Sequence, residues 1–524
     1  MKIYLSIFLL GLCGIFVSTH GFFNVNKKKH QKSVESPVLS PPYFGGEPIS
    51  LLDHSQSIKN QKPFVVIIPS YNNENFCRKN LESVFNQEYE NFRVIYIDDC
   101  SKDKTFSIVK ELFEKWDKSN GYKLIHNNHR YGAMANLYRA VHQCKPNEIV
   151  VTLDGDDWFA HERVLQWLNT AYSDGKTWLT YGQYIDYPRY TFGCNRPISL
   201  NGYSEKNFRN HPWVTSHLRT FYAGLFHKIR LDDFYYQNGF YQMGWDFSMM
   251  MPMIEMAWGH VRFIPDVLYI YNKLNDISDD KVNIKLQQYL ADHIRNKQPY
   301  SITSSIFPSQ KDTKKDLDII IFSENSPIVL KKTLESLTEC VGLEKKVNIL
   351  FDAKNVHDEK KYKELQANFN VNLIPFSFKE NNAFSFLQMI DKICQNEFIL
   401  LSTDHNNFHN LDLKEALNWL VKAQANGMYL GLEESELLSN NQVNGPYPLV
   451  NLFDDIFSWE YECNSTYMPK AREFTASIYP KSYIVNKLNK HRTLSFVELF
   501  NNWTLNIDQK NISIFYLENK CSTY

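Results

Sequence analysis

The stretch around which this chain is organised is VVTLDGDDWF, from Val150 to Phe159. Four apolar or β-forming residues precede three carboxylates that lie within four positions, which predicts a buried strand with acidic side chains at its carboxyl end. Ligands of open α/β sheets bind at that edge. Clustered carboxylates need a positive partner, and a hard divalent cation that carries phosphate oxygens would supply it. An acidic turn with ordinary loop chemistry is the alternative explanation.

The segments before this stretch alternate between strand and helix patterns. Phe64–Ile68 is a continuous apolar run of strand length, and further strands are predicted at 92–97 and 123–125. The predicted helices between them cover 75–85, 105–116 and a segment that ends at His142. Strands and helices in this order predict a mostly parallel sheet with helices on both faces, a doubly wound α/β fold.

Acidic side chains follow two of the predicted strands. Asp98 and Asp99 end the strand at 92–97, as Asp154 and Asp156 end the opening strand. All strand tips of a parallel sheet lie on one edge, so the two acidic groups are expected to converge across a crevice. The first strand lacks a Gly-x-Gly-x-x-Gly loop, and no Gly-x4-Gly-Lys-Ser/Thr motif occurs, which argues against dinucleotide and P-loop folds. A nucleotide site that holds diphosphate through a carboxylate-bound metal remains.

The composition excludes other classes of function. Lys and Arg together number 57 and Asp and Glu 58, a formal net charge of −1, so nucleic acid is not an expected partner. The nine cysteines include no Cys-x-x-Cys pair and predict neither a zinc site nor a disulfide framework. The length of 524 residues predicts two or three domains.

Four motifs occur in order within residues 63–275. They are VIIPSYN from Val66, IDDCSKD from Ile97, RYGAMAN from Arg130 and LDGDD from Leu153. Together they resemble a family 2 glycosyltransferase with the GT-A fold, over roughly half of the chain. The resemblance implies transfer of a sugar from a nucleotide donor to a hydroxyl acceptor, with inversion at the anomeric carbon.

The resemblance also implies a set of binding residues. The nucleotide is expected to contact Pro69, Tyr71, Asp98, Asp99, Arg130 and Asp154. A divalent cation, Mn2+ or Mg2+, is expected on the Asp-x-Asp element formed by Asp154 and Asp156. A surface salt bridge is the alternative role for Arg130. One departure from the family pattern is Cys100, which stands where glycine is usual.

Asp246 is the candidate catalytic base. It precedes a predicted helix at 247–257, where the resembled family places an acidic residue. An inverting transfer needs a carboxylate that removes the proton of the acceptor hydroxyl. Asp246 could also be the N-cap of that helix, and one residue can serve both purposes. Upstream, the polar insert His217–Phe221 either contacts acceptor or donor phosphate or packs as a loop with a satisfied histidine.

The second half of the chain repeats this layout. Residues 334–336 repeat the Leu-Glu-Ser of 81–83, and Asp404-His-Asn-Asn aligns with Asp154-Gly-Asp-Asp. Repeats of this length imply duplicated domains. Asn406 and Asn407 replace two carboxylates, which weakens metal binding. We therefore predict a GT-A domain at 63–300 and a second, divergent and non-catalytic GT-A-like domain with a C-terminal extension at 316–524.

The first 62 residues read as a targeting segment and a linker. A mostly apolar run, Ile3–Val17, predicts a signal peptide or membrane anchor at 1–21, followed by a linker at 22–62. The protein is therefore expected to be membrane-associated or to enter the secretory route, with the side of the membrane left open.

These observations predict a metal-dependent inverting glycosyltransferase. The donor is a nucleotide sugar, with UDP as the expected carrier, and the acceptor is a hydroxyl group on a glycan, lipid or protein. A nucleotidyltransferase is one alternative, but it usually has a Gly-rich basic loop after the first strand, unlike Pro69–Asn72. A non-catalytic carbohydrate-binding or scaffold protein built from two GT-A-like domains is the other, and the intact acids of the first half argue against it.

Overall fold

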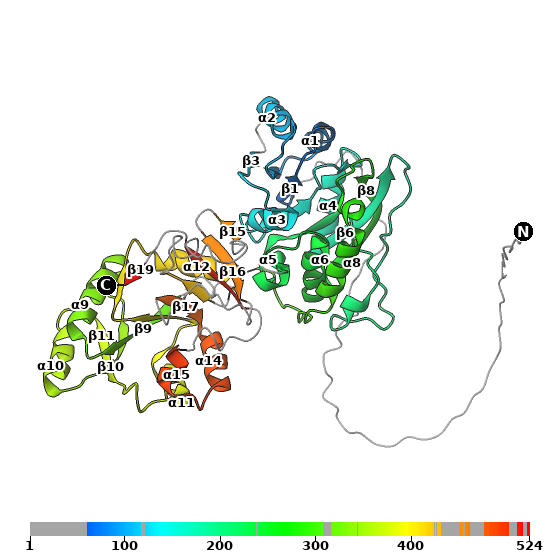
Figure 1. The fold of residues 1–524 in the computed structure, drawn as a ribbon. Helices are drawn as coiled ribbons and strands as arrows, with labels where there is room; N and C mark the ends of the chain where they lie inside the picture. Colours follow the sequence, from blue (N-terminus) through cyan, green and yellow to red (C-terminus); the bar gives the residue numbers. More distant parts are fainter. Residues whose placement is uncertain are drawn as a thin grey trace, which may run out of the picture. The chain divides into compact units, whose positions relative to one another are not determined.

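A computed structural model describes residues 60–523 and forms two large β-sheets with helices packed on them (Figure 1). The description leaves out residues 117–120, 237–238, 308–315, 343, 424, 426, 431–449, 454–455, 462–475, 502–510 and 517–520. The predicted signal or anchor segment and nearly all of the predicted linker lie outside the described residues. None of the helices in the described part has the length and apolar character that a membrane crossing requires.

The first sheet has eight strands in the order β3-β2-β1-β4-β7-β6-β8-β5. The strands β3, β2, β1 and β4 are parallel, β7 is antiparallel to both of its neighbours, β8 is parallel to β6, and β5 is antiparallel to β8. Their bounds are β1 Phe64–Ser70, β2 Phe92–Asp98, β3 Tyr122–His126, β4 Ile149–Thr152, β5 Trp158–Phe159, β6 Leu179–Tyr187, β7 Arg219–Tyr222 and β8 Val261–Asn272.

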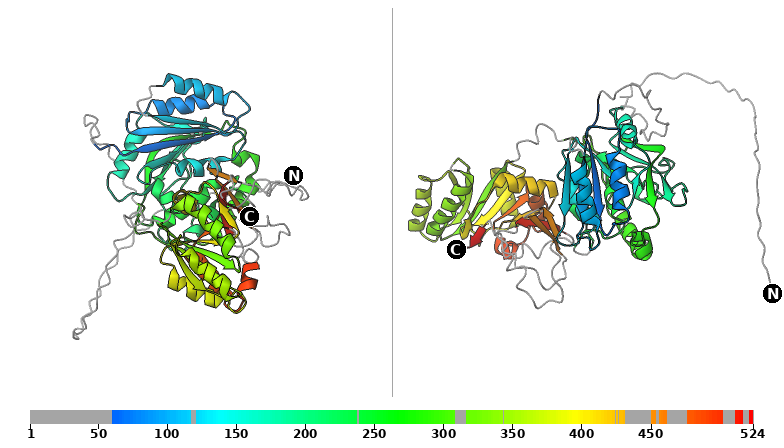
Figure 2. Two further views of the ribbon diagram at one scale, coloured as in Figure 1. Left: turned by 90° about the vertical axis from the view of Figure 1, so that its left-hand side faces the viewer. Right: turned by 90° about the horizontal axis from the view of Figure 1, so that it is seen from above.

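The helices of this half cover both faces of the sheet (Figure 2). Every residue of β1 is buried, which is why its sequence is a continuous apolar run rather than an alternating one. The helix α1 packs against α2, and α3 packs against α6. The bounds are α1 Cys77–Phe85, α2 Thr105–Lys115, α3 Ala133–Val141, α4 Val164–Tyr172, α5 Ala223–Phe226, α6 Trp245–Met256, α7 Asp279–Val282 and α8 Ile284–Arg295, with 3-10 turns η2 Phe208–Asn210 and η3 Leu231–Phe234. The predicted α/β fold with a mostly parallel sheet is confirmed.

The second sheet has nine strands in the order β11-β10-β9-β12-β17-β14-β18-β16-β15, and β13 pairs separately with β19. The strand bounds are β9 Leu317–Glu324, β10 Val347–Asp352, β11 Val371–Pro375, β12 Phe398–Thr403, β13 Asn406–Phe408, β14 Gly427–Tyr429, β15 Val450–Phe453, β16 Ile456–Tyr461, β17 Ser477–Pro480, β18 Asn511–Tyr516 and β19 Cys521–Thr523. The helices are α9 Pro327–Val341, α10 Val356–Leu365, α11 Ala383–Ile393, α12 Leu413–Ala423, α14 Lys481–Lys490 and α15 Phe496–Asn501.

The two sheets follow the same plan along most of their width. In each, four parallel strands are followed by a strand antiparallel to its neighbours, β7 in the first sheet and β17 in the second. The next two strands, β6 and β8 or β14 and β18, are parallel to each other. A second sheet in the C-terminal half therefore agrees with the predicted fold class. The domain boundaries at residues 63, 300 and 316 stay predictions.

Candidate functional site

The acidic tip of β4 is held in place by its neighbours on β1 and β8. The side chain of Asp157 is fully buried and accepts hydrogen bonds from the Tyr269 hydroxyl at 2.6 Å and the Asn272 backbone N–H at 2.7 Å. Burial, reinforced by the charges of Asp156 and Asp154, raises the pKa of Asp157 well above that of an ordinary carboxyl group. Asp157 thus ties the tip to β8.

Gly155 lets the tip pack directly against the end of β1. A Cβ atom at this position would lie 2.5 Å from the Ser70 hydroxyl oxygen and 2.6 Å from its Cβ, closer than side chains approach. The Gly155 N–H also donates to the Pro69 carbonyl at 3.1 Å. The glycine of the Asp-Gly-Asp-Asp sequence is therefore required by close packing. Pro69, a predicted nucleotide contact, holds the tip through its backbone.

Asp154 faces a histidine that lies two residues before β7. The ligand atoms of Asp154, Asp157 and His217 lie within 4.8 Å of one another, and His217 Nδ1 is 3.9 Å from Asp154 Oδ2. The imidazole is buried and stacks on the rings of Tyr269 and Tyr271. Burial, followed by the charge of Arg219, lowers the pKa of His217 well below its usual value, so the ring is neutral.

The Nδ1 atom of His217 fits a cation ligand. It has no hydrogen-bond partner within the described part of the chain. A neutral imidazole nitrogen beside a carboxylate is the donor set of many protein metal sites. The predicted ligand Asp156 is not in this group, and its Oδ2 accepts a hydrogen bond from Asn275 Nδ2 at 2.7 Å. The geometry thus brings together Asp154 and His217, whereas the sequence pointed to Asp154 and Asp156.

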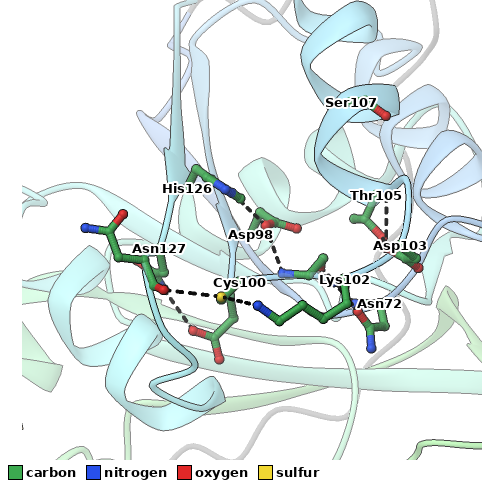
Figure 3. Close-up of polar contacts among 12 residues, drawn as sticks. Asn72, Asp98, Cys100, Lys102, Asp103, Thr105, Ser107, His126 and Asn127 are labelled. Atoms are coloured by element: carbon green, nitrogen blue, oxygen red, sulfur yellow. Dashed lines mark hydrogen bonds and ion pairs between the residues drawn. The ribbon is translucent and has the colours of Figure 1, made fainter.

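The acidic side chains at the end of β2 form hydrogen bonds with the end of β3 and with the loop that follows it (Figure 3). Asp98 is fully buried, and its Oδ2 lies 2.8 Å from His126 Nδ1 and accepts from the Ser101 N–H at 3.2 Å. Both oxygens of Asp99 are engaged by the chain: Asn127 Nδ2 donates to Oδ1, as does the Tyr131 N–H, and the Gly132 N–H donates to Oδ2. The carboxylate of Asp99 therefore fixes the loop that carries Arg130.

Tyr71 and Arg130 meet at this edge. The guanidinium carbon of Arg130 is 4.0 Å from the centroid of the Tyr71 ring, a cation–π contact. Among the described residues Arg130 forms no ion pair, so the stacking contact replaces the alternative salt bridge. The nearby Cys100 has a φ of 62°, in the left-handed region that favours glycine. Its thiol donates to the Asn128 carbonyl and accepts from Lys102 Nζ at 3.2 Å (Figure 3).

Asp246 lies in the first turn of α6, beside an arginine from β7. The N-cap of this helix is Gly244, with a φ of 63°, so the alternative N-cap role of Asp246 is wrong. Asp246 Oδ2 is 3.3 Å from Arg219 Nη2. Arg219 begins β7, and its backbone pairs with Thr152, two residues before Asp154. The polar insert at 217–221 is therefore part of this edge.

A segment of the amino-terminal half matches a known family model. Residues 65–231 match the model described as Glycosyl transferase family 2. An uncharacterized glycosyltransferase of Haemophilus influenzae is 29% identical over 119 residues, which are 23% of this chain and 46% of that protein. A GalNAc(5)-diNAcBac-PP-undecaprenol beta-1,3-glucosyltransferase of Campylobacter jejuni is 30% identical over 92 residues, 18% of this chain and 29% of that protein. The chain thus spans less than half the length of these relatives.

Solved structures overlap with this fold in part. The Staphylococcus aureus TarS 1–349 in complex with UDP-GlcNAc has a TM-score of 0.31 and 18% identity, covering 41% of this chain and 59% of that one. The mannosyltransferase PcManGT from Pyrobaculum calidifontis in complex with GDP-Man and Mn2+ has a TM-score of 0.34 and 19% identity, covering 46% and 67%. Scores this low describe a partial overlap of folds only.

Proposed function

We propose that this protein transfers a sugar from a nucleotide-sugar donor to a hydroxyl acceptor at the carboxyl edge of its first sheet. The proposal rests on two contacts that are made at the start of β7. The segment that leads into β7 places His217 against Asp154, and the first residue of β7 places Arg219 against Asp246. A cation-type donor set and a partly exposed carboxylate thus lie next to each other. Asp154, His217 and Arg219 fall within residues 65–231, which match the glycosyl transferase family 2 model, and Asp246 lies beyond that match.

The donor set supports a bound divalent cation. Asp154 and His217 would hold the ion. The support for this is the buried Nδ1 of His217, which has no hydrogen-bond partner among the described residues and could bind a cation. When bound, the cation neutralises charge on the diphosphate leaving group. A nitrogen ligand favours Mn2+ over Mg2+, because Mg2+ takes oxygen ligands. Asp156 would join as a ligand by giving up its hydrogen bond to Asn275.

The nucleotide would lie between the ends of β1 and β2. Tyr71, braced by Arg130, offers an aromatic face, and the ordered tip at Asp98 offers acceptor groups. Asp99 would act indirectly, because its oxygens already hold the loop that carries Arg130. UDP is the nucleotide we propose.

Asp246 would accept the proton of the acceptor hydroxyl as that oxygen attacks the anomeric carbon from the side opposite the leaving group, which inverts the configuration. Its side chain is 17% exposed, so it is open to an acceptor, and Nη2 of Arg219 orients it. The acceptor class is a hydroxyl group on a glycan, lipid or protein. Delivery of the protein to a membrane or the secretory route through residues 1–21 belongs to the same proposal.

We further propose that the second sheet is a divergent, non-catalytic copy of the first. The shared strand plan supports this origin. The polar groups at the tip of β12 are used by the chain itself: Asn406 Oδ1 accepts from the Ser402 hydroxyl, the Thr403 N–H and the Thr403 hydroxyl, and Asp404 Oδ2 accepts from the Ser323 hydroxyl. Such a tip has little left to offer a metal ion.

The test is sugar transfer with a panel of nucleotide sugars, UDP-sugars first, in the presence of Mn2+ or Mg2+. Release of free nucleoside diphosphate is followed, with and without acceptor hydroxyl compounds. We expect release that requires the cation and stops on chelation. If no donor is turned over and calorimetry detects no metal-dependent binding of nucleoside diphosphates, the chain is instead a carbohydrate-binding or scaffold protein.

A further inference from the structure

Arg219 is a buried arginine whose hydrogen-bonding groups are only partly used. Its side chain is 3% exposed, and its one ion pair with a described residue, Nη2 to Asp246 Oδ2, has a length of 3.3 Å. Its Nε and Nη1 atoms are buried and have no hydrogen-bond partner among the residues that the structure describes. Buried N–H groups are almost always paired, so unpaired ones on a charged side chain call for a partner from outside the chain.

A second buried arginine of the same half shows what a structural role requires. The side chain of Arg209 is 4% exposed, and its Nε and Nη2 donate to both oxygens of Glu255. Its Nη1 donates to the Ile294 carbonyl at 2.7 Å. All three nitrogens of Arg209 are therefore satisfied within the chain. Arg219 is equally buried, but two of its three nitrogens are left for something else.

The position of Arg219 defines the chemistry of that partner. Its backbone pairs with Thr152 at the end of β4, so the residue lies beside the tip that carries Asp154. The same strand region carries His217, which faces Asp154. A guanidinium is a permanent cation with five N–H donors, which suits phosphate oxygens. The N–H groups of Nε and Nη1 point in different directions, so each can donate to a separate oxygen of a nucleotide diphosphate.

We propose that the unpaired N–H groups of Arg219 donate to separate oxygens of the donor diphosphate while Nη2 holds Asp246, so that one guanidinium connects the leaving-group site with the base. This inference rests on the proposed function. Donated hydrogen bonds in a site shielded from water stabilise the charge that develops on the leaving diphosphate. Because the same side chain orients Asp246, binding of the donor and placement of the base are coupled.

Calorimetry with uridine, UMP and UDP in the presence of Mn2+ separates this role from a structural one, and the same series is run with other bases if uridine compounds do not bind. In the unaltered protein we expect the diphosphate to bind more tightly than the nucleoside. Arg219→Gln is expected to weaken UDP binding about tenfold or more and to leave uridine binding unchanged. Arg219→Lys keeps the charge but has three donors on one nitrogen in place of a planar guanidinium, and should recover only part of the lost affinity.

Two other arginines provide matched controls. Arg262 is the second residue of β8, at the opposite edge of the sheet, where its Nη1 is 3.6 Å from Asp174 Oδ2. Arg262→Gln should therefore bind UDP as the unaltered protein does. Arg209→Gln should lower the thermal unfolding midpoint, because it breaks a fully satisfied buried pair. Arg219→Gln should leave the midpoint unchanged or raise it.

The outcomes distinguish the two proposals. If Arg219→Gln and Arg219→Lys both bind UDP as tightly as the unaltered protein, the inference is wrong and the proposed function stands. A lowered unfolding midpoint for Arg219→Gln with the diphosphate preference retained would likewise make Arg219 a structural residue. If the unaltered protein binds no nucleotide of any base, the proposed function fails, and this inference fails with it.

Discussion

The tips of β4 and β12 occupy the same place in two sheets of the same plan, yet they use their polar groups in opposite ways. At β4 the sequence Asp-Gly-Asp-Asp faces His217, whose Nδ1 has no partner in the described chain. At β12 the sequence Asp-His-Asn-Asn is held by three hydrogen bonds from Ser402 and Thr403 of the same strand to Asn406, and by one from Ser323 of β9 to Asp404. A polar group that the fold satisfies contributes to stability, whereas a group that the fold leaves open is available for a ligand.

The antiparallel strands beside the two tips, β7 and β17, differ in the same way. Arg219 begins β7 and pairs with Thr152, and Ser477 begins β17 and pairs with Leu401. The first residue of the strand beside β4 is therefore a long cation, Arg219, whereas the first residue of the strand beside β12 is a short hydroxyl residue, Ser477. The difference teaches that the site depends on both members of the strand pair, so the acidic sequence alone does not define it.

The largest expected effect is on turnover, from Asp246→Asn. The amide keeps the shape of the side chain but cannot accept the proton, so the turnover number should fall about 10²–10⁴-fold with little change in donor affinity. Asp391→Asn, on the exposed surface of α11 in the second half, is the control and should transfer sugar normally. If steady-state kinetics show near-normal turnover in Asp246→Asn, Asp246 is not the catalytic base.

The second prediction compares the two tips as cation sites. Asp154→Ala should weaken Mn2+-dependent nucleotide binding about tenfold or more, since it removes a charged ligand. Asp404→Ala should leave that binding unchanged, because Asp404 already accepts from the Ser323 hydroxyl at 2.6 Å. Calorimetry of both variants measures the contrast, and equal losses would mean that both tips bind metal.

The third prediction concerns the second residue of each tip. Gly155→Ala should lower the free energy of unfolding by about 1–3 kcal/mol, because the new Cβ overlaps the Ser70 side chain. Ser70→Gly should relieve part of this loss in the double variant. His405 stands at the matching place with a side chain 58% exposed, so His405→Ala should stay within about 0.5 kcal/mol. Urea denaturation checks all of these values.

The smallest effect is expected for the closed tip itself. Asn406→Ala should destabilise the protein by about 1–2 kcal/mol, because it leaves buried donors of Ser402 and Thr403 without their acceptor. Sugar transfer should be unaffected. Loss of transfer without loss of stability would show that the second half takes part in the reaction, contrary to its proposed scaffold role.

The elements of the first sheet could be predicted because their signals are local. Buried parallel strands are continuous apolar runs, and the acids that end them are visible in the sequence. Thus the predicted strand at 64–68 lies within β1, and the helix predicted from residue 75 begins at Cys77. Asp98, Asp154 and Asp246 were found as acids at strand tips or at a helix start.

The remaining contacts join residues that are far apart in the sequence. The strand β7 inserts between β4 and β6, so no local pattern shows that His217 reaches Asp154 or that Arg219 reaches Asp246. The unusual polar insert at 217–221 was the available signal, and it did not distinguish a site from a packed loop. In the same way, the bond from Asn275 to Asp156 could not be read from the sequence.

The register of β7 has a consequence for how such a protein can change over time. Side chains of a strand alternate between faces, so a slip of one residue against β4 would turn the Arg219 side chain to the other face of the sheet. The connection from Tyr187 to β7 includes His217 and the buried Arg209, which share this constraint, whereas exposed stretches such as residues 199–202 do not. Insertions and deletions in such exposed stretches can therefore accumulate while the reacting groups stay in place.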